Sequence, residues 1–98
     1  STRAEGLASG RAYELPFMIL RGRLDDILLV SDEEMERAVR LIFDATRQVA
    51  ELSGAASTAA ALKIVDSLVG KKVVLMLTGG NIDADSFVSI LKGNPVKP

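Results

Sequence analysis

An apolar run that ends in a hydroxyl residue and two glycines constrains the fold of this chain most strongly. Residues 73–77 read Val-Val-Leu-Met-Leu, and Thr-Gly-Gly-Asn follows at positions 78–81. Five consecutive apolar residues predict a short buried strand, and a helix is expected to begin soon after it. This order is typical of α/β folds, which place ligands at the carboxyl ends of their strands. The glycines would let a flat ligand approach closely, although they also suit an ordinary strand-to-helix turn.

The rest of the chain predicts mainly helices. Ser-Asp-Glu-Glu at positions 31–34 fits a capping box, and apolar residues at helical spacing follow it. These features predict a helix from about residue 32 to residue 51. A second helix is expected over 54–68, closed by Gly70, and a final helix over 83–91.

Two further elements complete the expected fold. Residues 15–21 can form a short helix that starts with a proline in its first turn, and residues 27–30 predict a second buried strand. Residues 1–13 are expected to form a loop with a short helical turn. The predicted fold class is therefore α/β, in the order strand-helix-helix-strand-helix, with an incomplete sheet. Because two strands cannot close a core, the missing strands are expected to come from outside this segment.

The composition indicates a partial domain. The chain has 98 residues, of which 48% are hydrophobic. This hydrophobic content is high for a short chain, because a small domain buries a smaller share of its surface than a large one. Such an excess suggests surface that binds a partner. We therefore expect residues 1–98 to be a piece of a larger protein rather than a complete domain. This piece is expected to associate with the remainder of its own protein and to form a homo-oligomer.

Several classes of function are not expected. The net charge is −1 and the charges are interspersed, so no basic face for nucleic acid is predicted. The chain has no cysteine and no histidine, which excludes disulfides, a zinc site of the usual ligands and a histidine-dependent triad within it. No apolar run reaches the roughly 18 residues that a membrane-spanning helix needs, and no signal peptide is visible. The expected location is the cytoplasm.

Four blocks of the sequence together suggest a family. Residues 4–8 read Ala-Glu-Gly-Leu-Ala, residues 24–34 read Leu-Asp-Asp-Ile-Leu-Leu-Val-Ser-Asp-Glu-Glu, and residues 50–56 read Ala-Glu-Leu-Ser-Gly-Ala-Ala. With Thr-Gly-Gly-Asn at 78–81, they resemble in order and spacing the C-terminal part of threonine dehydratases and serine racemases. These are pyridoxal-phosphate enzymes of the tryptophan-synthase β family, fold type II. The family typically shows Glu-Pro-Ser/Ala-Gly-Ala and Ser-Gly-Gly-Asn, where this chain has a leucine for the proline and a threonine for the first serine.

The resemblance implies a cofactor and a reaction. It implies that the complete enzyme binds pyridoxal phosphate and that the hydroxyl of Thr78 holds N1 of the pyridine ring. A hydroxyl donates a hydrogen bond to a neutral ring nitrogen, whereas a carboxylate would keep the nitrogen protonated. The ring is then a weaker electron sink, which favours loss of a β-hydroxyl over transamination. The expected activity is that of a threonine or serine ammonia-lyase, which converts the small-molecule amino acid to a 2-oxo acid.

The resemblance also implies that Gly79, Glu51 and Tyr13 lie near the cofactor. Glu51 would otherwise be the last charged residue of a surface helix. Tyr13 stands where the family often has a glycine that passes over the cofactor, which leaves the shape of the pocket open. The small residues at the start of the second helix, 54–60, suit either tight packing or room for the edge of a cofactor.

The Schiff-base lysine of the family is not expected in this chain. The family carries it in a Ser-x-Lys-x-Arg-like segment, and no lysine here has that context: Lys63, Lys71, Lys72, Lys92 and Lys97. No catalytic residue is therefore assigned, and the segment alone is expected to be inactive. Two alternatives stay open: a non-catalytic α/β interaction or regulatory module, and a nucleotide site at 78–80. The nucleotide site would lack both a lysine after the glycines and the G-x-G-x-x-G spacing.

Overall fold

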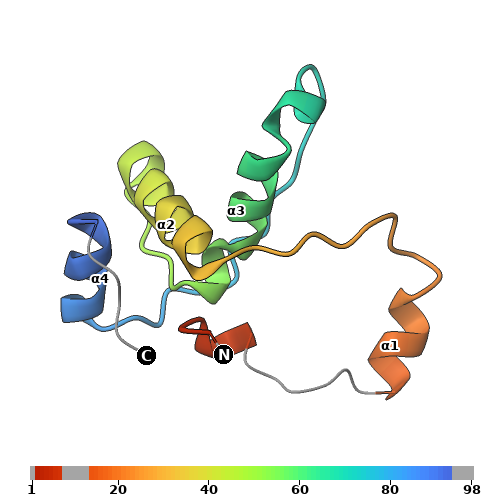
Figure 1. Ribbon diagram of the computed structural model, residues 1–98, viewed down its shortest axis with the longest axis horizontal. Coiled ribbons are helices and arrows are strands. Elements are labelled where there is room, and N and C mark those ends of the chain that lie inside the picture. Colours follow the sequence, from red (N-terminus) through yellow and green to blue (C-terminus); the bar gives the residue numbers. More distant parts are fainter. Residues whose placement is uncertain (1, 8–13, 94–98) are drawn as a thin grey trace.

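The computed structural model describes residues 2–7 and 14–93, and it is built from helices. Figure 1 shows α2 between α3 and α4, with the short 3₁₀ turn η1 near their lower ends, while α1 stands apart from this group. Within the described chain, α1 packs against none of the other helices. The elements are η1 (Glu5–Leu7), α1 (Glu14–Leu20), α2 (Asp32–Thr46), η2 (Ser53–Ala55), α3 (Ala56–Lys63), η3 (Val65–Leu68) and α4 (Ala84–Leu91).

The start of α2 confirms the predicted capping box. The main-chain N–H of Glu34 donates to the hydroxyl of Ser31 at 3.1 Å, and the Glu34 carboxylate accepts from the N–H of Ser31 at 2.8 Å. The two side chains thereby satisfy donors that a helix start leaves without intrahelical partners.

The predicted end of α2 at residue 51 is wrong. The helix ends at Thr46, because Arg47 adopts a left-handed conformation with φ 60°. The N–H of Arg47 donates to the carbonyl of Phe43 at 2.8 Å, so the turn is closed by a main-chain bond. Left-handed backbone at a helix end usually takes glycine or asparagine, so an arginine there gives the sequence no stop signal.

Residues 54–68 form one continuous helix in the prediction but three pieces in the structure: η2, α3 and η3. The break after α3 lies at Ile64, where φ is −119° and ψ is 24°. Gly70 has φ +78°, which confirms the predicted left-handed closure. The final helix is also confirmed, and Asp83 caps it by accepting from the N–H of Ser86 at 3.0 Å.

The core is small and rich in alanine. Short side chains let α2 and α3 approach closely, while the rings of Phe43 and Phe87 meet edge to face at 5.3 Å between α2 and α4. Arg40 donates to the carbonyl of Ile90 at 3.2 Å and ties the same two helices together. The buried apolar residues are Ala4, Met35, Ala38, Val39, Ile42, Ala50, Leu52, Ala55, Ala59 and Ile90.

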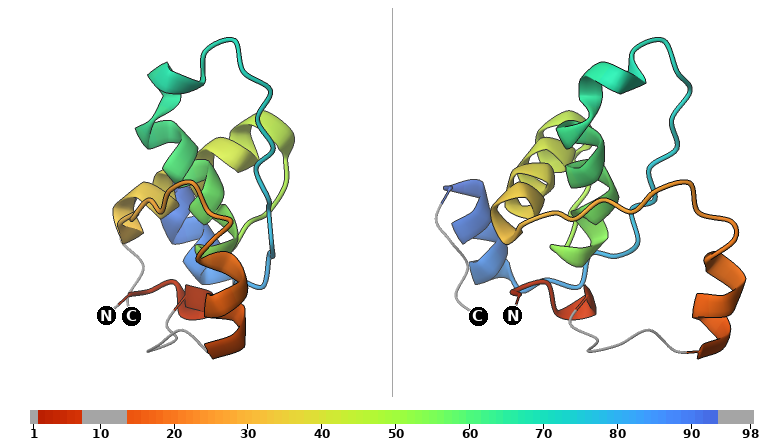
Figure 2. Two further views of the ribbon diagram at one scale, coloured as in Figure 1. Left: turned by 90° about the vertical axis from the view of Figure 1, so that its right-hand side faces the viewer. Right: turned by 45° about the vertical axis from the view of Figure 1, so that its right-hand side comes forward.

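The strands expected over 27–30 and 73–77 are not confirmed, since the described residues form no strand. Both segments run as irregular chain, and apart from the partly buried Val30 their apolar side chains are exposed; Leu29 is 82% exposed and Val74 is 86% exposed. In Figure 2 the segment after η3 runs beside α3 toward α4 without a neighbouring strand. A strand requires the main-chain hydrogen bonds of a partner, which an apolar run cannot supply by itself.

Residues 2–4 are tied to α2 by a partly buried arginine. The guanidinium of Arg3 pairs with Asp32 at 3.1 Å, with Glu33 at 3.3 Å and with Glu36 at 2.8 Å. Glu36 is only 5% exposed, and its carboxylate faces Arg3. The pairing anchors the N-terminal segment, which places Ala4 in the core and η1 beside η2.

This anchor should make stability depend on pH through Asp32. The hydroxyl of Thr2, followed by the N–H and guanidinium of Arg3, holds the pKa of Asp32 below its ordinary value. A lowered pKa means that the ionised form stabilises the fold above the ordinary pKa and that this contribution is lost as the pH falls through the lowered value. We therefore expect Asp32→Asn to destabilise the protein near pH 7 and to have little effect once the pH has fallen below the lowered pKa of Asp32.

Denaturant unfolding across this pH range measures the effect of Asp32→Asn. Asp44→Asn is the control, because Asp44 is an exposed residue of the same helix and makes the same change in charge. An equal loss of stability at both ends of the pH range for Asp32→Asn would contradict the prediction.

Candidate functional site

Three of the four sequence blocks meet at one place in the structure. The turn η2, from the block at 50–56, lies against η1 from the first block. The block at 50–56 also lies against the Thr-Gly-Gly-Asn segment, because the N–H of Glu51 donates to the carbonyl of Gly79 at 3.1 Å. Segments distant in sequence therefore form a single candidate site.

The carboxylate of Glu51 lies inside this junction. Its Oε1 accepts from the main-chain N–H of Asn81 at 3.4 Å, and its Oε2 accepts from the hydroxyl of Ser53 at 3.2 Å. Glu51 is partly buried and lies five residues beyond the end of α2. The interpretation of Glu51 as the last charged residue of a surface helix is therefore wrong.

The glycines at the junction allow segments of the chain to touch. A Cβ on Gly54 would lie 2.4 Å from the carbonyl oxygen of Gly79, and a Cβ on Gly79 would lie 2.4 Å from Oε1 of Glu51. A Cβ on Gly80 would lie 2.5 Å from the carbonyl oxygen of Val49. Protein atoms thus lie against the points that a Cβ would occupy at these three glycines. A contact of Gly79 with the cofactor stays a prediction. Only the main chain of Gly79 could make that contact.

Thr78 differs from the residues that follow it. Its side chain is exposed, whereas Gly79 and Asn81 are hydrogen-bonded to Glu51. An exposed hydroxyl on an anchored turn is chemically suited to donate to a pyridine nitrogen. The residue type at position 78 therefore fits one edge of the pyridine ring of a cofactor. Tyr13, the remaining predicted contact, lies outside the described residues.

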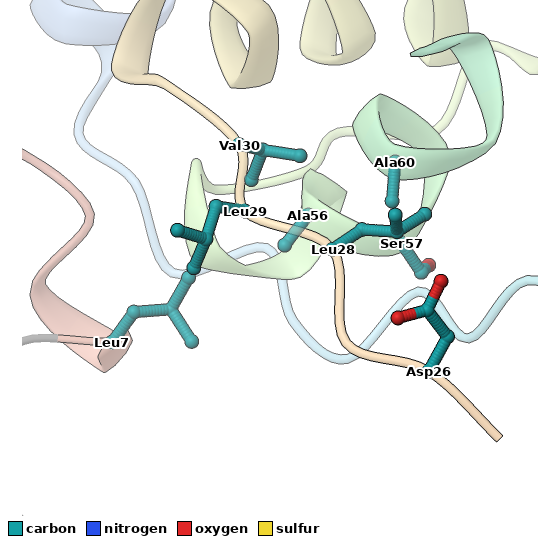
Figure 3. A pocket seen from close by; sticks show the side chains of 8 residues that line it. All are labelled: Leu7, Asp26, Leu28, Leu29, Val30, Ala56, Ser57 and Ala60. Carbon is teal, nitrogen blue, oxygen red and sulfur yellow. The ribbon is translucent and has the colours of Figure 1, made fainter. Parts of the chain in front are cut away.

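An open pocket lies beside the start of α3, where small residues were expected to pack tightly or leave room for a ligand. Its volume is about 480 Å³, and Figure 3 shows its lining, with Val30 and Ala60 at one side and Asp26 at the opposite edge. The lining is mostly apolar: Leu7, Asp26, Leu28, Leu29, Val30, Ala56, Ser57 and Ala60. Ala56, Ser57 and Ala60 thus line a pocket, whereas Ala55 and Ala59 of the same stretch are packed in the core.

Two hydroxyl residues of the site were missed by sequence reasoning. Ser53 binds the carboxylate of Glu51, and the hydroxyl of Ser57 donates to the carbonyl of Met76 at 2.8 Å. Ser53 belongs to the block at 50–56 and was therefore within reach of the motif argument. The bond of Ser57 joins residues 19 positions apart, and nothing in the local sequence signals it.

The described part of the chain offers neither a metal centre nor a membrane span. No three acidic side chains in it lie close enough together to hold a metal ion. None of its helices combines the length and the apolar character needed to cross a bilayer.

Comparisons with known proteins agree with the four blocks. A family model described as pyridoxal-phosphate dependent enzyme matches residues 1–79. An L-threo-3-hydroxyaspartate ammonia-lyase of Saccharomyces cerevisiae is 34% identical over 97 residues, which are 99% of this chain and 30% of the relative. An L-threonine ammonia-lyase of Thermotoga maritima is 33% identical over 96 residues, which are 98% of this chain and 24% of the relative.

A relative with a different activity is equally similar. A serine racemase of Dictyostelium discoideum is 33% identical over 93 residues, which are 93% of this chain and 28% of the relative. The chain thus spans between 24% and 30% of the length of these relatives. Since the family model covers more than half of the chain and the relatives match nearly all of it, the chain belongs to the pyridoxal-phosphate dependent enzymes, whose cofactor is pyridoxal phosphate.

Proposed function

We propose that the chain is part of an ammonia-lyase that removes water from threonine or serine and releases a 2-oxo acid and ammonia. The exposed hydroxyl of Thr78 on the anchored turn is the observation that carries the proposal. The ammonia-lyases among the similar proteins support the reaction class. A residue that donates to the ring nitrogen without protonating it suits β-elimination better than transamination.

This segment would form the wall beside the pyridine ring. Bound pyridoxal phosphate supplies the electron sink for loss of the Cα proton and the β-hydroxyl. The hydroxyl of Thr78 would donate to N1 of the bound ring, and we propose that Glu51, Gly79 and Tyr13 would lie near the same edge. The Schiff-base lysine comes from outside residues 1–98, so the segment alone is inactive.

The unpaired apolar segments call for a binding partner. Residues 73–77 and 27–29 expose apolar side chains without a neighbouring strand. Extended apolar segments of this kind readily form main-chain hydrogen bonds with another segment of protein. We propose that they pair with the remainder of the enzyme, which forms a homo-oligomer. The 98-residue chain by itself should then self-associate in sedimentation experiments and bind a dye for apolar surface. A monomer at high concentration that binds no such dye would contradict this expectation.

The activity is tested on the complete enzyme loaded with pyridoxal phosphate. The substrates are L-threonine, L-serine and L-threo-3-hydroxyaspartate, and the readouts are 2-oxo acid, ammonia and D-serine. We expect 2-oxo acid and ammonia from threonine or serine. Formation of D-serine alone would overturn the lyase assignment in favour of a racemase. A protein that neither binds the cofactor nor consumes an amino acid would favour the non-catalytic module instead.

A further inference from the structure

Both carboxylate oxygens of Glu51 bind protein groups on either side of one junction. Oε2 accepts from the hydroxyl of Ser53 in the same loop, and Oε1 accepts from the N–H of Asn81 in the facing turn. We propose that Glu51 is a positioning residue that fixes the turn carrying Thr78, and not a direct ligand of the cofactor. The proposal rests on the proposed function, in which Thr78 meets the ring.

The contacts of Glu51 hold the chain after Thr78. Its N–H donates to the carbonyl of Gly79 at 3.1 Å, and its carboxylate receives the N–H of Asn81 at 3.4 Å. On the other side, the hydroxyl of Ser57 donates to the carbonyl of Met76 at 2.8 Å. The main chain is thus held at positions 76, 79 and 81, while Thr78 between them is exposed.

Gly79 is required for the carboxylate to reach the turn. A Cβ at this position would lie 2.4 Å from Oε1 of Glu51, with no other atom nearby except Cδ of the same side chain at 3.5 Å. Gly80 makes a matched contrast, because its Cβ would meet the main-chain oxygen of Val49 at 2.5 Å. A side chain can move away from a new methyl group, but the main chain of a packed loop cannot do so easily.

This contrast gives a double-mutant test. Glu51→Ala removes the carboxylate, and Gly79→Ala displaces it, so the two changes disturb the same contact. We expect their effects on cofactor affinity to be non-additive, with the double variant no worse than Glu51→Ala alone. The effects of Gly80→Ala and Glu51→Ala should instead add, because the methyl group at position 80 meets Val49.

Amide hydrogen exchange supplies a readout that does not depend on activity. In the complete enzyme, we expect Glu51→Ala to speed exchange at Asn81 by about tenfold or more, since its N–H loses a charged acceptor. Glu51→Gln keeps an oxygen for Asn81, and the hydroxyl of Ser53 can rotate to accept from its amide. Glu51→Gln should therefore retain most of the protection from exchange and most of the cofactor affinity.

The outcomes separate the proposal from its alternatives. Loss of cofactor affinity in Glu51→Gln equal to that in Glu51→Ala, with exchange at Asn81 unchanged in both, would overturn the positioning role and indicate a direct ligand. Additive effects of Glu51→Ala and Gly79→Ala would also overturn it. If Glu51→Ala speeds exchange at Asn81 but the protein binds no pyridoxal phosphate, Glu51 does hold the turn. The proposed function, and with it a role of Glu51 in positioning Thr78 for the cofactor, would then be overturned.

Discussion

Replacing Gly54 with alanine is expected to separate the two loops of the candidate site. The new Cβ would lie 2.4 Å from the carbonyl oxygen of Gly79 and 3.0 Å from its nitrogen, and neither atom belongs to a flexible side chain. The loops must move apart, which strains the packing and disturbs the 3.1 Å bond from the N–H of Glu51. We expect a loss of about 1–3 kcal/mol of stability from overpacking, together with weaker binding of pyridoxal phosphate by the complete enzyme.

Thermal unfolding and titration with the cofactor measure the effect of Gly54→Ala. Gly22→Ala is the matched control, because a Cβ there meets no atom within 4 Å. Gly6→Ala should be intermediate, since its Cβ would lie 2.5 Å from the hydroxyl oxygen of Ser53, which belongs to a side chain. Full stability and full cofactor affinity in Gly54→Ala would show that the loops do not meet as closely as the structure indicates.

Local signals in the sequence predicted local structure well. Ser31 and Glu34 lie three residues apart and form their capping box from their own side chains, so the start of α2 follows from the sequence. Two other local features also depend on nearby residues only. Asp83 accepts from the N–H of Ser86 at the start of α4, and Gly70 adopts left-handed backbone after η3. The end of α2 was not predictable because Arg47 adopts left-handed backbone without the residue type that usually signals it.

Features that depend on distant residues were predicted less well. The apolar runs at 27–30 and 73–77 suit strands, but a strand forms only when another segment supplies hydrogen bonds. The side chain of Lys63 donates to the carbonyl of Leu29 in the run at 27–30, at 2.7 Å, and the hydroxyl of Ser57 donates to the carbonyl of Met76 in the run at 73–77. Both donors are side chains, so neither bond pairs two strands.

The glycines show a related limit of sequence reasoning. A glycine indicates that no Cβ fits, but it does not indicate which atoms occupy the space. The sequence left open a ligand or an ordinary turn at Gly79 and Gly80, and the structure places Glu51 and Val49 against the points that a Cβ would occupy there. The family resemblance identified Glu51 as a site residue, but its contact with Asn81 joins positions 30 residues apart and required the fold.

Substitutions of Thr78 should separate its hydroxyl from its shape. Thr78→Ser keeps the donor, so the complete enzyme should retain much of its activity. Thr78→Val keeps the shape but leaves N1 of the ring without a partner, at a cost of about 1–3 kcal/mol, or about fivefold to 150-fold in rate. Thr78→Asp places a carboxylate at N1, which favours a protonated ring and should alter the products as well as the rate.

The measurements are 2-oxo acid release and the absorption spectrum of the bound cofactor for all three Thr78 variants. Thr46→Val is the control, because it makes the same chemical change at an exposed position at the end of α2. Its effect should be confined to stability, since the Thr46 hydroxyl donates to the carbonyl of Ile42 within the helix. Equal rates and an unchanged spectrum in Thr78→Val would mean that position 78 does not contact the ring. The anchored turn would then serve the packing of the chain, because its bonds to Glu51 do not involve the Thr78 hydroxyl.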